Sequence, residues 1–155
     1  MPTKKVVKKK EEAVEKKETA KEEKKKYFYA VGRRKTAIAR VKIFPTKDAK
    51  NSLTINERKF EDYFTVGRMQ ESVKAPLEHL GEGTNFEVEA NVYGGGISAQ
   101  ADAVKLGIAR ALVIFNADLK KALKKEGHLK RDPREVERKK PGLKKARRSP
   151  QWAKR

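Results

Sequence analysis

The chain has 155 residues, of which 40 are basic and 21 acidic, and its formal net charge is +19. It contains no cysteine, which excludes disulfides, thiolate metal ligands and a cysteine nucleophile and fits an intracellular protein. No apolar run approaches the roughly 20 residues that a membrane-spanning helix needs, so we expect no membrane partner.

The positive charge is unevenly distributed along the chain. Residues 27–119 carry 13 basic and 11 acidic side chains, whereas residues 120–155 carry 16 basic and 4 acidic ones. Such a segment is best neutralised by a dense polyanion, because each neutralised phosphate also releases a condensed counterion. RNA or DNA is therefore the expected partner, and a solvated tail that only improves solubility is the alternative.

Composition divides the chain into three segments. Residues 1–26 contain 11 Lys and 6 Glu but few apolar residues, so they cannot bury enough surface to offset the entropy of ordering. We expect a disordered Lys/Glu-rich extension at 1–26, a globular RNA-binding domain at 27–126 and an extended basic tail at 127–155.

Four strands are expected, at 27–31, 36–44, 53–55 and 86–93. In these stretches apolar residues alternate with polar ones, or aromatic and β-branched residues cluster. The first two strands are predicted to form a hairpin with a cationic turn at Gly32-Arg33-Arg34-Lys35.

The helices are predicted from apolar spacing. A helical region at 60–80 is broken at Pro76, and a long amphipathic helix at 98–115 has Ser98 as its expected N-cap and Asn116 at its end. A short helix is expected at 118–126, and Asp132-Pro133-Arg134-Glu135 is typical of another helix start. The order of elements predicts an α+β fold, with a mixed four-stranded sheet and helices on one face.

Basic residues gather in and after the expected hairpin turn. These candidate RNA contacts are Arg33, Arg34, Lys35, Arg40 and Lys42. Arginine suits phosphate because its planar fork donates two hydrogen bonds, and neighbouring aromatics at 27–29 can stack on exposed bases. The aromatics can instead belong to the strand core or cover the sheet, and that interpretation is the one we favour.

Three glycines, Gly94, Gly95 and Gly96, separate a strand from the long helix. Their backbone amides could approach a phosphate at the helix N-terminus. The known nucleotide patterns do not fit, since Ile97-Ser98 follows the glycines and Ala99 occupies the last position of G-x-G-x-x-G. A backbone contact to RNA phosphate, a small-nucleotide site and a simple tight connection are the three alternatives.

The sequence gives little indication of a metal site. His79 and His128 lack companions at metal-ligand spacing, so both are interpreted as surface or packing residues, and no metal or cofactor is expected.

The densest basic run lies at 139–148 and contains Pro141 and Gly142, which argue against a continuous helix. Its candidate RNA contacts are Lys139, Lys140, Lys144, Lys145, Arg147 and Arg148, and we expect this segment to lie along a nucleic-acid surface.

Three blocks of sequence together resemble one family, the bacterial form of small-subunit ribosomal protein nine. The blocks are Val31-Gly-Arg-Arg-Lys-Thr-Ala-Ile-Ala-Arg-Val41, then Gly94-Gly-Gly-Ile-Ser-Ala-Gln100 running into Gly107-Ile-Ala-Arg-Ala-Leu112, and the tail from Arg131 to Arg155. The resemblance covers about residues 27–155 and leaves the N-terminal extension outside.

The resemblance implies a βαβ ribosomal-protein fold and no enzymatic activity. It implies a structural role on the cytoplasmic ribosome, with ribosomal RNA of the subunit head and neighbouring ribosomal proteins as partners. The tail would reach the anticodon stem-loop of the tRNA in the peptidyl site, with Lys154 and Arg155 as the tRNA contacts. The basic hairpin turn and the run at 139–148 would then contact ribosomal RNA.

Two other classes of function remain as alternatives. An architectural DNA-binding protein would explain the charge, but it should bind duplex DNA as tightly as RNA. An RNA-processing enzyme or phosphotransferase on the same fold would need metal- or nucleotide-dependent turnover, which no constellation of residues here supports.

Overall fold

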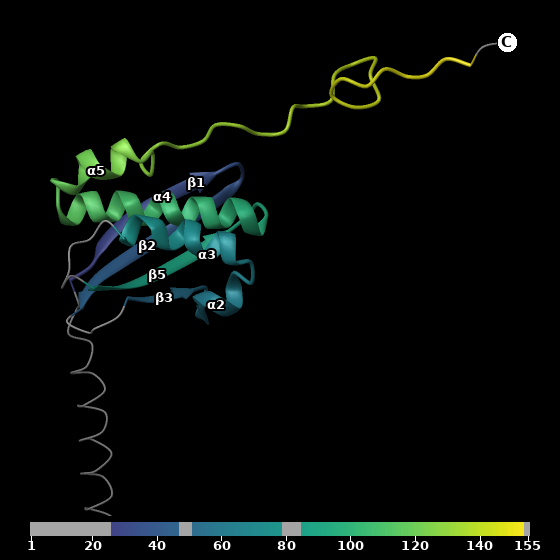
Figure 1. Cartoon of the computed structure of the whole chain (residues 1–155). Coiled ribbons are helices and arrows are strands. Elements are labelled where there is room, and N and C mark those ends of the chain that lie inside the picture. Colours follow the sequence, from purple (N-terminus) through teal and green to yellow (C-terminus); the bar gives the residue numbers. More distant parts are fainter. Residues whose placement is uncertain (1–25, 47–50, 79–84, 154–155) are drawn as a thin grey trace, which may run out of the picture.

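Figure 1 shows a computed structural model of the protein, which describes residues 26–46, 51–78 and 85–153. Nearly all of the expected N-terminal extension, His79, and the expected tRNA contacts Lys154 and Arg155 lie outside the described residues. The described part is a sheet with helices packed on it, from which the C-terminal segment projects (Figure 1).

The sheet has five strands in the order β1-β2-β5-β3-β4. They are β1 (Phe28–Arg34), β2 (Ala37–Thr46), β3 (Ser52–Ile55), β4 (Arg58–Lys59) and β5 (Asn85–Tyr93). Strands β3 and β5 are parallel and the other pairs are antiparallel, so the predicted mixed sheet and strand, helix, strand unit are confirmed.

The predicted number of four strands is wrong, because β4 was not recognised. It consists of two exposed charged residues, and a segment that short has no apolar alternation. It forms because Asn56 and Glu57, with φ of 48° and 64°, make a two-residue turn that returns the chain beside β3.

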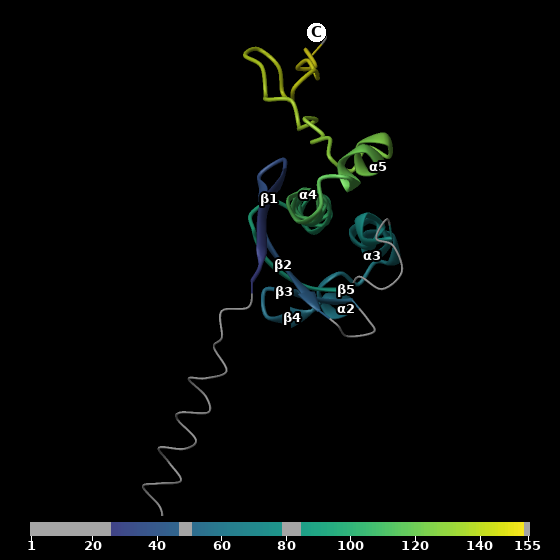
Figure 2. The same cartoon turned by 90° about the vertical axis from the view of Figure 1, so that its left-hand side faces the viewer.

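Strand β2 shows why one face of the sheet is the core. Ala37, Ala39, Val41 and Ile43 are completely buried, and the intervening residues point to the other face. Strand β5 repeats this pattern from Phe86 to Val92. As expected, helices cover the buried face: α3 and α4 lie on it side by side (Figure 2).

The predicted helical region at 60–80 is divided into α2 (Phe60–Tyr63), α3 (Gly67–Lys74) and a 3₁₀ turn, η1 (Ala75–Leu77). Pro76 lies inside η1, so the predicted interruption there is confirmed. In the described part of the chain no helix is both long and apolar enough to cross a membrane.

The long helix α4 (Ile97–Phe115) packs on β1 and β2 and buries Val104, Ile108 and Leu112 completely. The expected end is confirmed, because the Asn116 amide donates to the Leu112 carbonyl. The expected start is wrong: Gly96 occupies the N-cap position without a side-chain hydrogen bond, two residues before the expected N-cap Ser98. Ile97, expected on the buried stripe, is 56% exposed.

Two glycines let β1 approach α4 unusually closely. A Cβ atom on Gly32 would lie 1.8 Å from the carbonyl oxygen of Ala103, and one on Gly107 would lie 2.5 Å from Cγ2 of Val41. Neither position has room for a side chain. This close crossing brings the first half of α4, including Asp102, to the end of the β1–β2 hairpin.

Helix α5 (Leu119–Lys125) confirms the short helix expected at 118–126. It buries Leu123 completely and ends in a Schellman turn: Gly127 has φ of 79°, its amide donates to Lys124, and the His128 amide donates to Leu123. The chain then runs back along α4, and Leu129 packs against the core. We call residues 127–134 the tail root and residues 135–155 the tail, of which the structure describes 135–153.

The helix expected to start at Asp132 does not form, since residues 130–140 have no regular structure. The Asp132 carboxylate does accept a hydrogen bond from the Arg134 amide at 2.9 Å, as in an N-cap, but it is also bound by arginine side chains. The residues that follow carry no apolar face that a helix could bury.

Candidate nucleic-acid interface

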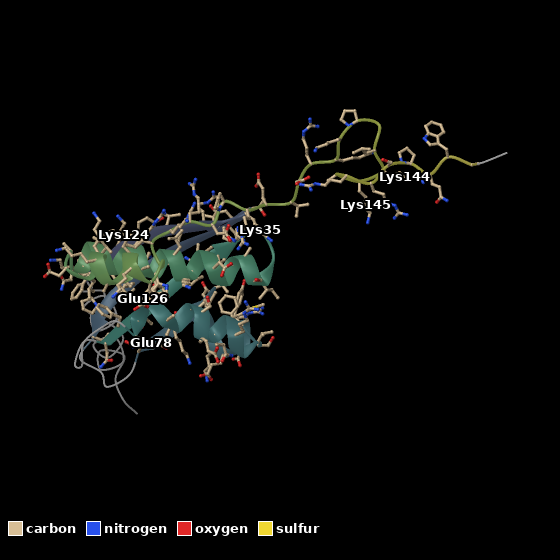
Figure 3. The ribbon with its side chains drawn as sticks, turned by 45° about the horizontal axis from the view of Figure 1, so that its top comes forward. Lys35, Glu78, Lys124, Glu126, Lys144 and Lys145 are labelled. Carbon is tan, nitrogen blue, oxygen red and sulfur yellow. The ribbon has the colours of Figure 1, made fainter. Side chains whose placement is uncertain are left out.

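The basic residues of the hairpin end face in different directions. Strand β1 continues through Arg34, and the turn consists of Lys35 and Thr36, so the predicted turn at 32–35 was placed too early. Lys35, with φ of 51°, and Arg33 are exposed. Figure 3 shows Lys35 at the end of the body from which the tail emerges, and Lys144 and Lys145 far out on the tail.

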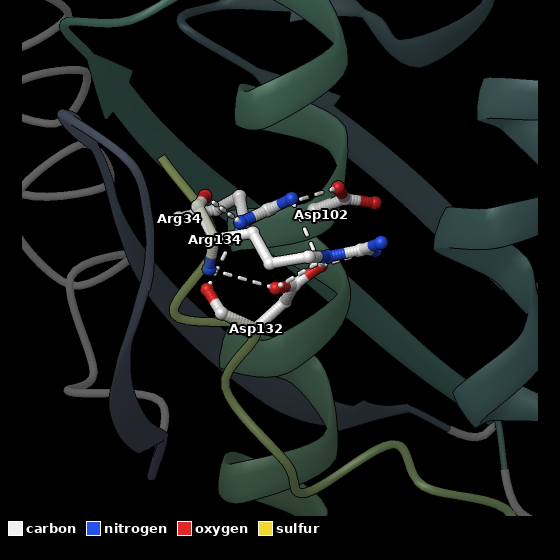
Figure 4. Close-up of polar contacts among 4 residues, drawn as sticks. All are labelled: Arg34, Asp102, Asp132 and Arg134. Atoms are coloured by element: carbon white, nitrogen blue, oxygen red, sulfur yellow. Dashed lines mark hydrogen bonds and ion pairs between the residues drawn. The ribbon is translucent and has the colours of Figure 1, made fainter. Parts of the chain in front are cut away.

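Arg34 is turned inward, with 11% of its side chain exposed, and it binds the tail root (Figure 4). Its guanidinium donates to the carbonyl oxygens of Asp132 at 3.0 Å and Arg134 at 2.6 Å. It also pairs with the carboxylates of Asp132 at 2.9 Å and Asp102 at 3.5 Å. The sequence predicted that Arg34 contacts RNA. In this structure, however, the N–H groups of its guanidinium bind the chain's own tail root.

Asp132 is the centre of this contact. Hydrogen bonds from the Arg134 side chain and backbone, with smaller contributions from the positive charges of Arg134 and Arg34, lower the pKa of Asp132 well below its ordinary value. The same bond raises the pKa of Arg134. Asp132 is therefore ionised at neutral pH and joins two arginines that the sequence separates by a hundred positions.

The face of the sheet opposite the helices carries the other predicted cations of the hairpin. The Arg40 guanidinium lies 5.5 Å from the ring centre of Tyr93, and the Lys42 ammonium lies 5.4 Å from that of Tyr27. Tyr27, Tyr29 and Tyr93 are about half exposed. Of the aromatics at 27–29, Phe28 packs against Phe115, as the core interpretation expects. The two tyrosines do not belong to the core, but Tyr27 packs against Phe44 and so fits the expected sheet cover.

The glycines before α4 have a local structural explanation. Gly94 and Gly95 have φ of 73° and 65°, and a Cβ on either would lie within 3 Å of Thr36 or Ala37 in the hairpin. Gly96 has open space around it. The tight-connection alternative thus explains the first two glycines, and a phosphate contact by 94–96 stays a prediction.

Six cations of the tail were predicted to contact RNA, and the structure places them on an irregular segment. Five of them, Lys139, Lys140, Lys144, Lys145 and Arg148, are exposed and have no ion pair with any described residue. Arg147 pairs with Glu137 at 2.5 Å, and the Lys144 amide donates to the Arg148 carbonyl at 2.8 Å, which closes a loop in the tail. As Pro141 and Gly142 predicted, no helix forms there.

Comparison of the sequence with known proteins shows the family of this chain. The sequence model of the family described as Ribosomal protein S9/S16 matches residues 32–155. The chain belongs to this family. The proteins named small ribosomal subunit protein uS9 in Prochlorococcus marinus strain MIT 9215 and Parasynechococcus marenigrum strain WH8102 are each 49% identical over 129 residues. These matches span 83% of this chain and 93% and 95% of the relatives.

A third relative, the protein of that name in Prochlorococcus marinus strain MIT 9211, is 50% identical over 83% of this chain and 92% of its own length. Family membership confirms the resemblance seen in the sequence and identifies the chain as a ribosomal structural protein. The family match begins at Gly32 and leaves the N-terminal extension outside.

The fold also brings together basic residues that the sequence did not single out. Lys105 of α4 and Lys130 and Arg131 of the tail root line a cleft of about 260 Å³, together with Arg33. The excess of positive charge after residue 119 could have indicated Lys130 and Arg131 as candidates. Lys105 lies in a nearly neutral stretch, and its place in the cleft follows only from the packing of α4. In the described residues no group of three His, Asp or Glu side chains is placed to hold a metal ion.

Proposed function

We propose that this ribosomal protein is a structural constituent of the small subunit that binds ribosomal RNA in the subunit head and reaches the tRNA of the peptidyl site with its C-terminus. The observation that carries this proposal is the family match, which includes the whole basic tail up to Arg155. Neighbouring ribosomal proteins of the head are further partners in this proposal.

The body and the tail have different parts in the proposed function. The body offers cations to RNA at the hairpin end and on the open sheet face, through Arg33, Lys35, Arg40 and Lys42. Along the tail, Lys139 to Arg148 add phosphate contacts. Contacts with phosphate fix position without reading base sequence, so every tRNA that enters the site is accepted.

The length of the tail fits this division. From Asp132, where Arg34 holds the chain, 23 residues lead to Arg155, and an extended chain of that length reaches up to about 75 Å at roughly 3.3 Å per residue. The anchored root and the free length together allow Lys154 and Arg155 to act far from the body.

The first test is fractionation of a lysate on a sucrose gradient in moderate and then high salt. We expect the protein to migrate with the small subunit and with whole ribosomes, and to stay there through the salt wash. A pool at the top of the gradient, or loss at modest salt, would mean nonspecific binding through the charged segments and would contradict the proposal.

The second test separates the tail tip from the body. Deletion of Lys154 and Arg155 should accelerate dissociation of tRNA from the peptidyl site and leave subunit assembly intact. The matched control is Lys120→Gln with Lys121→Gln, which removes the same charge from helix α5. Normal tRNA dissociation from ribosomes with the deletion would exclude these two residues as tRNA contacts.

A further inference from the structure

The cleft at the tail root is lined by more cations than its acidic groups can neutralise. Its two carboxylates, Asp102 and Asp132, are both engaged with Arg34, and Asp132 also with Arg134. The remaining cations of the lining are Arg33, Lys105, Lys130 and Arg131. None of these four forms an ion pair with another described residue, so the cleft keeps an uncompensated positive charge.

The two cations of the tail root are held in place from both sides. On one side, the Schellman turn at Gly127 redirects the chain and Leu129 packs against the core. On the other side, Asp132 is bound by Arg34. Lys130 and Arg131 lie between these fixed points, so their backbone is ordered before any ligand arrives and binding loses less conformational entropy.

The other two cations come from separate elements of the rigid body. Lys105 is on α4, three residues after Asp102, and Arg33 precedes Arg34 on β1. The close crossing of β1 and α4 at Gly32 and Gly107 fixes the distance between these elements. Three segments that are distant in sequence therefore converge on one cleft.

From this arrangement we infer that the tail-root cleft is a preformed binding site for an internucleotide phosphate of RNA. A volume of about 260 Å³ is several times the roughly 30 Å³ that one water molecule occupies in the liquid, so a phosphate group fits with part of its hydration. Arginine provides a planar pair of donors for the phosphate oxygens, and lysine provides a compact charge. This inference rests on the proposed function and assigns RNA contacts to Lys105, Lys130 and Arg131.

An RNA backbone fits the cleft better than a free anion does. The cleft lies at the point where the cationic tail leaves the body, between Lys35 of the hairpin end and the basic residues further along the chain. A phosphate bound there belongs to a strand that can continue along either group of cations. The backbone of that strand would then fix where the tail begins its path over the RNA.

The test compares two variants of the full chain that lose the same charge. Lys105→Gln with Lys130→Gln removes two lysines from the cleft, and Lys120→Gln with Lys121→Gln removes two exposed lysines from α5 that do not line it. Binding to a transcript of the RNA of the small-subunit head is measured over a range of salt concentrations. Circular dichroism first establishes that both variants are folded.

We expect the cleft variant to bind about tenfold more weakly than the control, because it loses charge-assisted hydrogen bonds to phosphate. The slope of log K against log salt should decrease by about 0.7 to 0.9 for each lost contact. In the wild-type chain, RNA should shift the amide NMR signals of Gly127, Lys130 and Arg131, and inorganic phosphate at the same ionic strength should not.

Four outcomes would overturn the inference. Equal weakening in both variants would mean that the lysines act only through net charge. Equal shifts with inorganic phosphate and RNA would identify a site for a free anion. Unchanged amide signals at the tail root while RNA binds elsewhere would exclude the cleft as an RNA-binding site and leave the proposed function standing. A wild-type chain that does not bind the transcript would overturn the proposed function as well as this inference.

Discussion

The Nη2 atom of Arg34 lies 2.9 Å from Oδ2 of Asp132, which joins strand β1 to the tail root across 98 positions of sequence. The same guanidinium donates to two backbone carbonyls of the tail root, so it holds the path of the chain as well as one side chain. The tail is therefore attached to the end of the hairpin and does not simply trail from helix α5.

Substitution of Arg34 by Gln should release the tail root, because two backbone hydrogen bonds and two ion pairs are lost together. The chain has no native cysteine, so spin labels can be attached at Ser98→Cys and Val136→Cys. We expect a broader distribution of distances between the labels in the Arg34→Gln protein than in the parent.

The neighbouring residue provides the control for that experiment. Arg33→Gln removes the same charge from the same strand, but Arg33 has no bond to Asp132 in the structure. The distance distribution should stay narrow in this variant. Equal broadening in both variants would show that the charge of the hairpin end, and not the Arg34 contacts, directs the tail.

The pH dependence of the tail-root contact follows from Asp132. Hydrogen bonds from Arg134 lower its pKa from the ordinary value of 3.8, so the ionised carboxylate is favoured when the contact is formed. Such a group contributes its full stabilisation above pH 3.8, and the contribution declines as the pH falls toward the folded-state pKa. Carboxyl-carbon NMR should therefore give a midpoint for Asp132 well below 3.8.

The Arg134→Ala variant tests the assigned cause of this shift. Since the largest effect on Asp132 is the side-chain hydrogen bond of Arg134, its removal should raise the midpoint toward the ordinary value. The Arg34 contact remains in this variant and should keep part of the shift. An Asp132 midpoint that does not change on this substitution would contradict the assignment.

The sequence predicted the elements whose pattern is local and repeated. The alternation from Ala37 to Ile43 and the spacing of Val104, Ile108 and Leu112 each reflect one buried face, and the structure confirms both. Strand β4 was missed because two charged residues have no such pattern. The start of α4 was misplaced because Gly96 fills the cap position through backbone geometry alone, which a search for a capping side chain does not detect.

The candidate site was harder to predict because its parts meet only through tertiary packing. Asp132 has the local signature of a helix start, but Arg34 competes for its carboxylate from a distant strand, and no local pattern contains that partner. Lys105 reaches the cleft because Gly32 and Gly107 allow β1 and α4 to touch. The sequence therefore showed which basic and acidic residues were available, but it did not show which of them would lie together in the cleft.

A third prediction concerns the close crossing that sets this geometry. Gly32→Ala should lower the free energy of unfolding by about 1 to 3 kcal/mol, because the new methyl would overlap the backbone of α4, which cannot rotate away as a side chain could. Chemical denaturation measures the change. Gly67→Ala is the control, since a Cβ there meets nothing within 4 Å, and its stability should be unchanged or slightly higher.

The last prediction separates the energetics of the body from those of the tail. A chain that ends at Arg138 loses eight cations. The lost side chains that the structure describes are mostly exposed, and their contacts are within the tail itself. Exposed ion pairs such as Glu137 with Arg147 add little to stability, so the melting temperature should match that of the full chain. Binding to head RNA should weaken instead, and its salt slope should decrease by about 0.7 to 0.9 for each tail cation that contacts phosphate. A slope equal to that of the full chain would mean that residues 139–155 do not contact RNA, and a lower melting temperature would mean that the tail packs on the body.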